Sequence, residues 1–349
     1  MMISERVPLA PLTTLGVGGP ARYFAEACTE SDVRQAVEYA QSRDLPLFVL
    51  GGGSNLLVSD RGFDGLVLKI CLRGIELTPG ADDTVISSVA AGEEWDGFVV
   101  RAVEENCAGI ECLSGIPGSV GGTPVQNVGA YGQEVSETVR EVTALDRQSL
   151  QLRTFTNAEC GFGYRSSIFN TTERDRYIIL RVSYSLRRGG KPAMRYADLQ
   201  KAFQDVSYSP TLSDVRTAVR EIRRRKAMLI VPGDDDARSA GSFFKNPIVP
   251  QHQFEVIEAQ LRARGLVLPN YPAGEGFRKL PAAWLVEHTG FAKGYTRGAA
   301  GISRRHTLAI VNRGGATAAD IVALKDEIQS RVLSEFGIQL QPEPVFLGF

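Results

Sequence analysis

The sequence predicts an α+β protein of two domains, and three observations support this prediction. Helix and strand patterns alternate up to about residue 186, a polar Arg-Arg-Gly-Gly-Lys-Pro break follows at 187–192, and a second mixed set runs to the C-terminus. A chain of 349 residues is long enough to bury more than one core. We therefore expect a boundary at 190–212, with the smaller domain after it.

Hydrophobic periodicity places the elements in order along the chain. Apolar residues at helical spacing predict helices at 33–40, 95–103 and 215–222. A last helix should begin near Thr317 and end at Gly337, which suits a helix C-terminus. Ser213 is the expected cap of the helix at 215–222. Apolar and β-branched runs predict strands at 47–50, 66–70, 85–90 and 177–186.

Composition limits the class of protein. The formal net charge of −1 gives no reason to expect nucleic acid or an anionic membrane as a partner. Five cysteines without a CxxC pair fit buried free thiols in a reducing compartment, and argue against disulfides or a metal site. No stretch has signal-peptide character or transmembrane length. We expect a cytoplasmic protein that acts as a monomer.

Two glycine-rich tracts predict a site for a ligand. The strand at 47–50 runs directly into Gly51-Gly52-Gly53-Ser54-Asn55, which suggests backbone N–H groups turned toward a phosphate. A dinucleotide-binding Rossmann motif requires a helix next, and the short stretch 59–65 leaves no room for one. The second tract runs from Ser114 to Gly132. Two such loops indicate a nucleotide bound by a different fold.

A third segment, Gly241–Pro247, has the sequence Gly-Ser-Phe-Phe-Lys-Asn-Pro. A buried aromatic pair beside a cation and an amide predicts a rigid loop that holds the Ser242 hydroxyl against a ligand. Taken alone, this pattern fits a structural turn about as well.

Together these segments resemble the UDP-N-acetylenolpyruvoylglucosamine reductases, flavoproteins of peptidoglycan precursor synthesis. The resemblance covers nearly the whole chain. Within the family, the chain is similar to the longer of two types, in which a tyrosine loop closes over the substrate. The matching segments are 51–55, 114–132, 160–169, 241–247 and 342–343. The implied fold is the FAD-binding fold of the p-cresol methylhydroxylase and vanillyl-alcohol oxidase class, followed by an α+β substrate domain. The resemblance implies an FAD-binding domain at 1–190, made of two subdomains that meet near residue 70. It also implies a substrate-binding domain at 211–349, whose last residues, from about 338, return to the flavin site.

The resemblance also implies a reaction and its residues. NADPH reduces non-covalent FAD, and the enolpyruvyl ether of a UDP-sugar becomes a lactyl ether. Ser242 is then the proton donor, while Arg165 and Glu343 hold the substrate carboxylate. The implied substrate-binding residues are Tyr164, Tyr196, Lys226 and Asn246. The implied cofactor-binding residues are Gly51, Gly52, Gly53, Ser54, Asn55, Ser114, Gly115, Ile116, Pro117, Gly118, Ser119, Gly121, Gly122, Asn127, Gly129, Ala130, Tyr131, Gly132 and Arg223.

The chain departs from the family pattern at several positions. Ser166 replaces an aspartate found in many members, and Gln341 replaces a glutamate that often stands two residues before the catalytic one. Val345 stands where some members carry an arginine. The acidic stretch 233–236 is longer than in the shortest members, which makes the match of Lys226 less secure.

Two other functions compete with this interpretation. One is an oxidase or dehydrogenase of the same fold that acts on an alcohol or lactone. Such enzymes often hold FAD through a histidine, but the three histidines here, His252, His288 and His306, all follow the expected FAD domain. The other is an inactive flavin- or nucleotide-binding module. The presence of all three expected catalytic residues argues against it.

Overall fold

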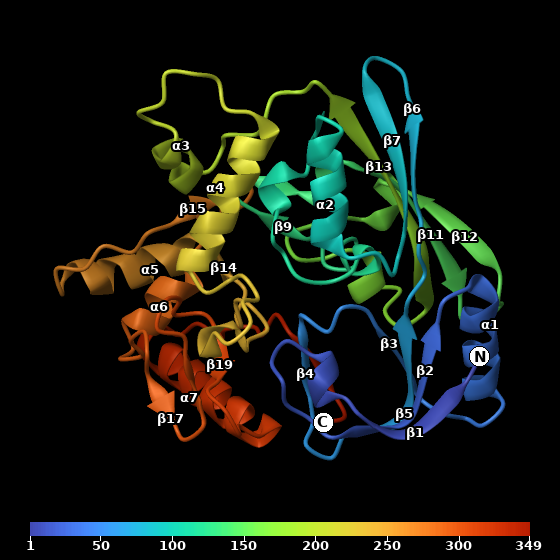
Figure 1. Ribbon diagram of the computed structural model, residues 1–349. Coiled ribbons are helices and arrows are strands. Elements are labelled where there is room, and N and C mark those ends of the chain that lie inside the picture. The colour runs from blue at the N-terminus through green and yellow to red at the C-terminus, as the bar shows by residue number, and fades with distance from the viewer. The chain divides into compact units, whose positions relative to one another are not determined.

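The computed structural model describes residues 1–349 and shows two compact units (Figure 1). Unit 1 comprises 1–8, 20–53 and 63–229, and unit 2 comprises 9–19, 54–62 and 230–349. The main division therefore falls after Leu229, whereas the sequence placed it at 190–212. The limits of the FAD-binding and substrate-binding domains stay a prediction. No helix is both long and apolar enough to cross a membrane.

Unit 1 begins with a four-stranded sheet in the order β1-β2-β5-β3. β1 pairs antiparallel with β2, and β5 pairs in parallel with both β2 and β3. Helix α1 (Glu30–Gln41) follows β2 and buries the apolar stripe predicted at 33–40. The four strands are β1 (Ile3–Pro8), β2 (Pro20–Ala27), β3 (Leu47–Leu50) and β5 (Phe63–Ile70).

A larger antiparallel sheet makes up the rest of unit 1, in the order β12-β11-β13-β7-β6 with β8 also on β13. Helix α2 (Trp95–Glu104) runs beside it in Figure 1. The α2 residue Phe98 packs against Tyr184 of β13, with ring centroids 5.1 Å apart. The strands are β6 (Ile75–Pro79), β7 (Thr84–Ala90), β8 (Cys107–Ala108), β11 (Val139–Asp146), β12 (Leu152–Thr156) and β13 (Tyr177–Arg188), with the separate pair β9 (Gly129–Ala130) and β10 (Gln133–Glu134).

The helix expected at 215–222 is α4 (Leu212–Arg225), preceded by α3 (Ala197–Ala202). Its cap is Thr211, so the prediction of Ser213 is wrong. The Thr211 hydroxyl accepts a hydrogen bond from the Asp214 N–H at 3.2 Å, and the Asp214 carboxylate accepts from the Thr211 N–H at 2.9 Å. This reciprocal capping box needs an acidic residue three positions after the cap. Ser213 has Arg216 there, so it lies inside the helix instead.

Unit 2 contains the long helix α7 (Ala318–Phe336), which buries one face in the core of the unit. Thr317 caps it and Gly337 ends it in a left-handed conformation with φ 63°, as predicted. The other elements are α5 (Gln251–Arg262), α6 (Ala282–Glu287), the sheet β14 (Ile248–Pro250), β16 (Phe277–Lys279) and β15 (Tyr271–Pro272), the sheet β17 (Thr296–Arg297), β18 (Ala300–Ile302) and β19 (Ile310–Asn312), and the pair β4 (Leu56–Val58) and β20 (Val345–Leu347).

The short segment 54–62 belongs to unit 2 for identifiable reasons. β4 pairs in parallel with β20 near the C-terminus. The Asp60 carboxylate accepts hydrogen bonds from the Ala318 and Ala319 N–H groups at 2.7 and 2.9 Å, at the start of α7. Because 54–62 is used in this way, no helix follows β3 before β5. The exclusion of a Rossmann motif is confirmed.

All five cysteines are free thiols. Cys107, Cys112 and Cys160 are buried, and burial raises the pKa of Cys160 to about 12. Cys28 is exposed and Cys71 is partly so, which corrects the expectation that the thiols are buried.

Candidate active site

The structure brings the two predicted glycine tracts together in unit 1. A Cβ atom on Gly52 would lie 2.6 Å from the Cα of Gly118, and one on Gly51 would lie 2.6 Å from the Ser119 Oγ. A side chain at Gly52 would collide with the backbone of the opposite tract, so glycine is required there, whereas at Gly51 it would meet only the Ser119 hydroxyl, which can rotate away. The Trp95 N–H, at the start of α2, donates to the Gly118 carbonyl at 3.0 Å and fixes the second tract.

The beginning of the second tract is held between α2 and α4. The Gly115 N–H donates to Asp96 at 2.6 Å, and the Arg223 Nε donates to the Gly115 carbonyl at 3.1 Å. Burial lowers the pKa of Arg223, which is only 8% exposed. Arg223 therefore positions the tract directly, while its predicted contact with the cofactor stays a prediction.

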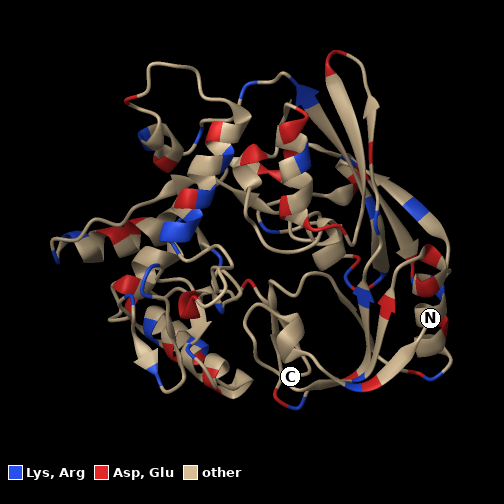
Figure 2. Cartoon of the chain, viewed as in Figure 1, with Lys and Arg blue, Asp and Glu red and all other residues tan.

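Asp96 also neutralises the basic face of α4, whose Lys and Arg residues are blue in Figure 2. Its carboxylate accepts from Arg216 at 2.6 and 2.9 Å and from Arg220 at 2.7 Å. Burial would raise the pKa of Asp96, but the hydrogen bonds from Arg216 and the Gly115 N–H hold it below its ordinary value. One carboxylate thus orders both the glycine tract and the helix behind it.

A buried glutamate that the sequence analysis did not single out supports the same tract. Glu111 is 1% exposed and accepts from the Gly109 N–H, the Gln133 Nε2 and the Ala193 N–H at 2.8 to 2.9 Å. The Ser114 hydroxyl donates to the Glu111 carbonyl at 2.6 Å. No motif marks this residue, because its three partners come from separate segments of the chain.

The end of the second tract is linked to the loop that carries Arg165. The Arg165 Nη2 donates to the Gly129 carbonyl at 2.9 Å, and the Asn127 Nδ2 donates to the Gly163 carbonyl at 3.0 Å. Asn127, Tyr131 and Arg165 all have φ between 45° and 53°, which non-glycine residues rarely adopt. Strained backbone of this kind clusters at functional sites. These three predicted site residues therefore form one strained patch.

The predicted nucleotide-binding side chains also form a cluster in unit 1. The rings of Tyr131 and Tyr196 meet edge to face, with centroids 5.4 Å apart. The Lys226 Nζ lies 5.9 Å from the Tyr196 ring centroid and pairs with Asp198 at 2.6 Å. Burial is the largest influence and opposes the charged form of Lys226, but the hydrogen bond to Asp198 and the electrostatic effects of Tyr196, Asp198 and Tyr131 together outweigh it and raise the pKa. Tyr164 lies beside the neighbouring Arg165 guanidinium, 5.4 Å from ring centroid to Cζ.

Unit 2 holds the other two predicted catalytic residues on adjacent segments. The Phe243 carbonyl accepts from the Glu343 N–H at 2.9 Å, and the Gln341 carbonyl accepts from the Lys245 N–H at 2.9 Å. The aromatic pair Phe243–Phe244 is buried, as predicted for a rigid loop. Glu343 therefore makes this backbone hydrogen bond itself, and Ser242 is the residue next to its acceptor, Phe243.

Asn55 and Asn246 already have partners in unit 2. The Asn55 Nδ2 donates to the Glu343 carbonyl at 3.2 Å, so this predicted cofactor residue supports the catalytic segment. The Asn246 Oδ1 accepts from the Ala282 N–H at 2.9 Å at the start of α6. Their predicted contacts with cofactor and substrate stay predictions, as does the joint action of Arg165 with Ser242 and Glu343.

The sequence analysis did not assign a role to His306. Its Nε2 lies 3.1 Å from the Ser242 Oγ, within hydrogen-bond distance. The two residues are 64 positions apart, and no spacing rule connects them. The chain has no group of three or more His, Cys, Asp or Glu side chains that could hold a metal ion.

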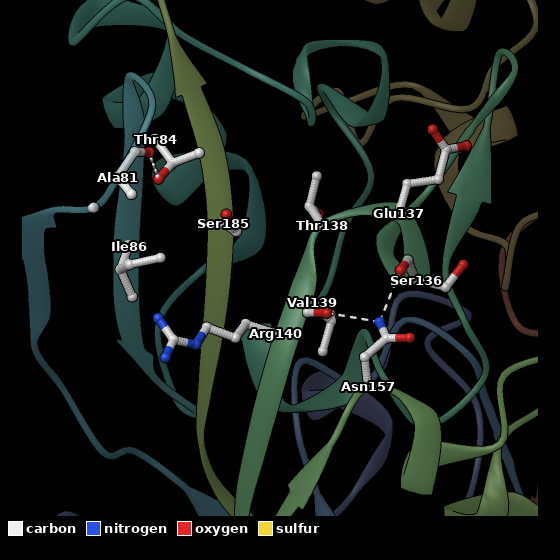
Figure 3. Close-up of a pocket in the computed structure, with 11 residues that line it drawn as sticks. Ala81, Thr84, Ile86, Ser136, Glu137, Thr138, Val139, Arg140, Asn157 and Ser185 are labelled. Carbon is white, nitrogen blue, oxygen red and sulfur yellow. Dashed lines mark hydrogen bonds between the residues drawn. The ribbon is translucent and has the colours of Figure 1, made fainter.

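A groove of about 610 Å³ lies elsewhere in unit 1 (Figure 3). Residues of β7, β11 and β13 line it, and the Asn157 amide at its edge donates to the carbonyls of Ser136 and Val139 at 2.9 and 2.6 Å. None of the predicted site residues lies in this groove.

Comparison with known proteins gives matches along nearly the whole chain. Residues 21–154 match the FAD binding domain family, and residues 233–347 match the family described as UDP-N-acetylenolpyruvoylglucosamine reductase, C-terminal domain. The chain is 48% identical to the UDP-N-acetylenolpyruvoylglucosamine reductase of Thermobifida fusca, over 99% of this chain and 98% of that one. It is 42% identical to that of Pseudomonas aeruginosa, over 98% of each chain.

A solved structure agrees with these matches. The crystal structure of UDP-N-acetylenolpyruvylglucosamine reductase from Thermus caldophilus superposes with a TM-score of 0.68, at 27% identity, over 99% of this chain and 100% of that one. The predicted fold class, an FAD-binding α+β domain with a C-terminal α+β domain, is confirmed.

Proposed function

This chain belongs to the UDP-N-acetylenolpyruvoylglucosamine reductase family, and we propose that it catalyses the reaction for which the family is named. The enzyme is an FAD-containing oxidoreductase that uses NADPH. It reduces the enolpyruvyl ether of UDP-N-acetylglucosamine-enolpyruvate to the lactyl ether of UDP-N-acetylmuramate, a precursor of peptidoglycan. We place it in the cytoplasm as a monomer.

The two glycine tracts fit FAD as the cofactor. Gly51 and Gly52 pack directly on Gly118 and Ser119, and glycine backbone of this kind can approach a pyrophosphate closely. When bound there, FAD would supply hydride transfer from NADPH to the double bond of the substrate. The protein then has to bind the nucleotide, orient the double bond and supply one proton.

Ser242 supplies that proton, to the carbon that bears the ether oxygen. A hydroxyl is a weak acid in water, but an enolate carbon is a strong base, so the position of the hydroxyl matters more than its pKa. The observation that carries this assignment is the backbone pairing of the Ser242 loop with the Glu343 segment. This pairing holds the backbone next to Ser242 against the segment that carries Glu343.

Arg165 and Glu343 act on the substrate carboxylate. The guanidinium is always charged and can form two parallel hydrogen bonds to a carboxylate as negative charge builds up there. The strained backbone of Arg165 and its bond to the Gly129 carbonyl fix its direction. Glu343 is either protonated or shares the guanidinium, because two bare carboxylates repel each other.

Tyr196 and Lys226 act on the nucleotide, with Tyr164 and Asn246 beside the substrate. Lys226 stands near the pyrophosphate, where its ion pair with Asp198 preserves its charge in a half-buried place. Tyr196 closes over the nucleotide. Its ring is 40% exposed and rests edge to face on Tyr131, which leaves area for contact with a ligand.

Anaerobic half-reactions test the proposal. The purified yellow protein should lose its flavin absorbance with NADPH and regain it when the enolpyruvyl nucleotide is added without oxygen. Reoxidation by oxygen alone, or by an alcohol-derived product, would instead favour the oxidase alternative, which the matched relatives do not support. A protein that binds FAD but is not reduced by NADPH would favour the inactive module.

A further inference from the structure

We propose that His306 is a positioning residue for Ser242: its Nε2–H donates to the serine Oγ, turns the serine proton toward the substrate and stabilises the oxygen after that proton leaves. This inference rests on the proposed function. The observation behind it is the 3.1 Å distance between the Ser242 Oγ and the His306 Nε2.

The direction of the hydrogen bond follows from what a proton donor must do. A serine hydroxyl has one proton and two acceptor lone pairs. If Ser242 donated its proton to His306, none would point toward the substrate. The histidine must therefore be the donor, with the proton on Nε2. The Oγ–H bond can then break toward the substrate carbon.

The proton balance of the step is simple. The Oγ–H bond breaks and the new C–H bond forms, and the electron pair of the O–H bond stays on Oγ. The Nε2–H hydrogen bond stabilises that negative charge, because hydrogen bonds to ionised oxygen are stronger than neutral ones. A proton from water restores the hydroxyl, and His306 keeps its own proton throughout.

The loop that carries His306 is built to hold it in place. His306 lies in the hairpin connection between β18 and β19, where the Ser303 N–H donates to the Ala309 carbonyl at 2.9 Å. The Phe243 N–H donates to the Leu308 carbonyl at 2.7 Å, so the same hairpin is tied to the serine loop directly. The donor and the residue that it positions are thus parts of one hydrogen-bonded unit.

The acidic stretch 233–236 is part of this arrangement. Asp236 is 4% exposed and accepts from the Ser303 hydroxyl at 3.2 Å and the Arg304 N–H at 3.0 Å, while Asp234 pairs with Arg305. On the other side of the histidine, the Thr307 hydroxyl donates to Glu287. Arg304 and Arg305 thus precede His306 in the hairpin, and the carboxylates that pair with its neighbours in the chain are Asp234, Asp236 and Glu287. Each carboxylate among them has a partner in or next to the hairpin.

A matched pair of variants separates hydrogen bonding from packing. In His306→Gln the amide nitrogen can occupy the place of Nε2, whereas in His306→Asn it reaches only the place of Nδ1. Both variants are polar and smaller than histidine. We expect His306→Asn to slow reoxidation of reduced flavin by the enolpyruvyl nucleotide by about 10–100-fold, the lower range for loss of a group that assists a positioned acid. In His306→Gln the reoxidation rate should stay within about fivefold of the wild-type rate, because the amide still donates a hydrogen bond, although a weaker one.

A second readout needs neither FAD nor substrate. In Ser242→Cys, a hydrogen-bond donor at position 306 should stabilise the thiolate. The rate at which iodoacetamide alkylates the introduced thiol should therefore rise with pH about a midpoint below the ordinary thiol pKa of about 8.5. Mass spectrometry of the peptide that contains position 242 separates this reaction from that of the exposed Cys28. Adding His306→Asn should raise the midpoint by about one unit or more, and adding His306→Gln should raise it less.

His252→Asn is the control, because the same substitution is made at an exposed histidine of the same unit. It should leave both readouts unchanged. Equal behaviour of the Gln and Asn variants, or an alkylation midpoint that does not move when His306 is replaced, overturns the proposal. Absence of any reoxidation by the nucleotide in the wild type would refute the proposed function, and the alkylation midpoint would still report on the serine–histidine pair.

Discussion

Replacing Ser242 by alanine is expected to block one half of the reaction and leave the other intact. The loop should keep its shape, because it is held by the buried rings of Phe243 and Phe244 and by backbone bonds to Leu308 and Glu343. The serine side chain is only partly buried. Removal of its oxygen therefore costs little stability and removes one hydrogen-bonding group, the one next to His306.

The size of the effect follows from the role of the hydroxyl. A positioned general acid contributes about 10²–10⁴-fold, which corresponds to about 2.7–5.4 kcal/mol of transition-state stabilisation. Stopped-flow measurement of flavin absorbance should show reoxidation by the enolpyruvyl nucleotide slowed by at least about 10²-fold. Reduction by NADPH should proceed near the normal rate, because that step needs no proton from this oxygen.

Two further variants give the comparison. Ser242→Cys should retain more activity than Ser242→Ala, since a thiol can still donate a proton. Ser334→Ala, at an exposed position on α7, should behave as the wild type. If Ser242→Ala were reoxidised at the normal rate, the assignment of Ser242 would be refuted, and the loop at 241–247 would be structural only.

Three other predictions concern the substrate, the fold and the cofactor. Tyr196→Ala should raise KM for the nucleotide by the equivalent of about 1–3 kcal/mol, as loss of a stacked ring does, with normal reduction by NADPH; an unchanged KM would remove Tyr196 from the site. Asp96→Asn should lower the free energy of urea unfolding by about 2–4 kcal/mol near neutral pH, because Arg216 loses its partly buried partner. Since the folded-state pKa of Asp96 is lowered, its contribution is present above the ordinary carboxyl pKa of about 4 and disappears as the pH falls through the lowered value. The difference between wild type and Asp96→Asn should therefore shrink in acid, and a constant difference would contradict the reasoning. Acid precipitation should release the flavin into solution, because no histidine precedes His252 to anchor it; colour retained in the pellet would show a covalent bond.

Local patterns predicted those elements whose signals are contained in a few neighbouring residues. Leu47–Leu50 is a strand with the predicted limits, and α7 begins and ends at the predicted Thr317 and Gly337. The cap of α4 was placed two residues late because Thr211 and Ser213 are both good caps. Only the acidic partner three residues after the cap distinguishes them.

Long-range pairing explains what the sequence did not reveal. β4 is three residues long and forms because it meets β20 almost 290 positions away, so no local pattern predicts it. Glu111 is buried because three separate segments supply its hydrogen-bond donors. In isolation it reads as an ordinary acidic surface residue.

The candidate site shows the same division between local and long-range information. The glycine tracts and the serine loop carry signals in their own segments, and the aromatic pair of the serine loop is buried as expected. The segment with Glu343 is positioned by two partners. The Phe243 carbonyl, in the Ser242 loop, accepts a hydrogen bond from the Glu343 N–H, and the Asn55 side chain donates one to the Glu343 carbonyl. Asn55 ends the first glycine tract, and β4 begins at the next residue. A change at Asn55 should therefore disturb the segment that carries Glu343, the proposed catalytic carboxyl group, even if the cofactor binds normally, which an assay of FAD content alone would not detect.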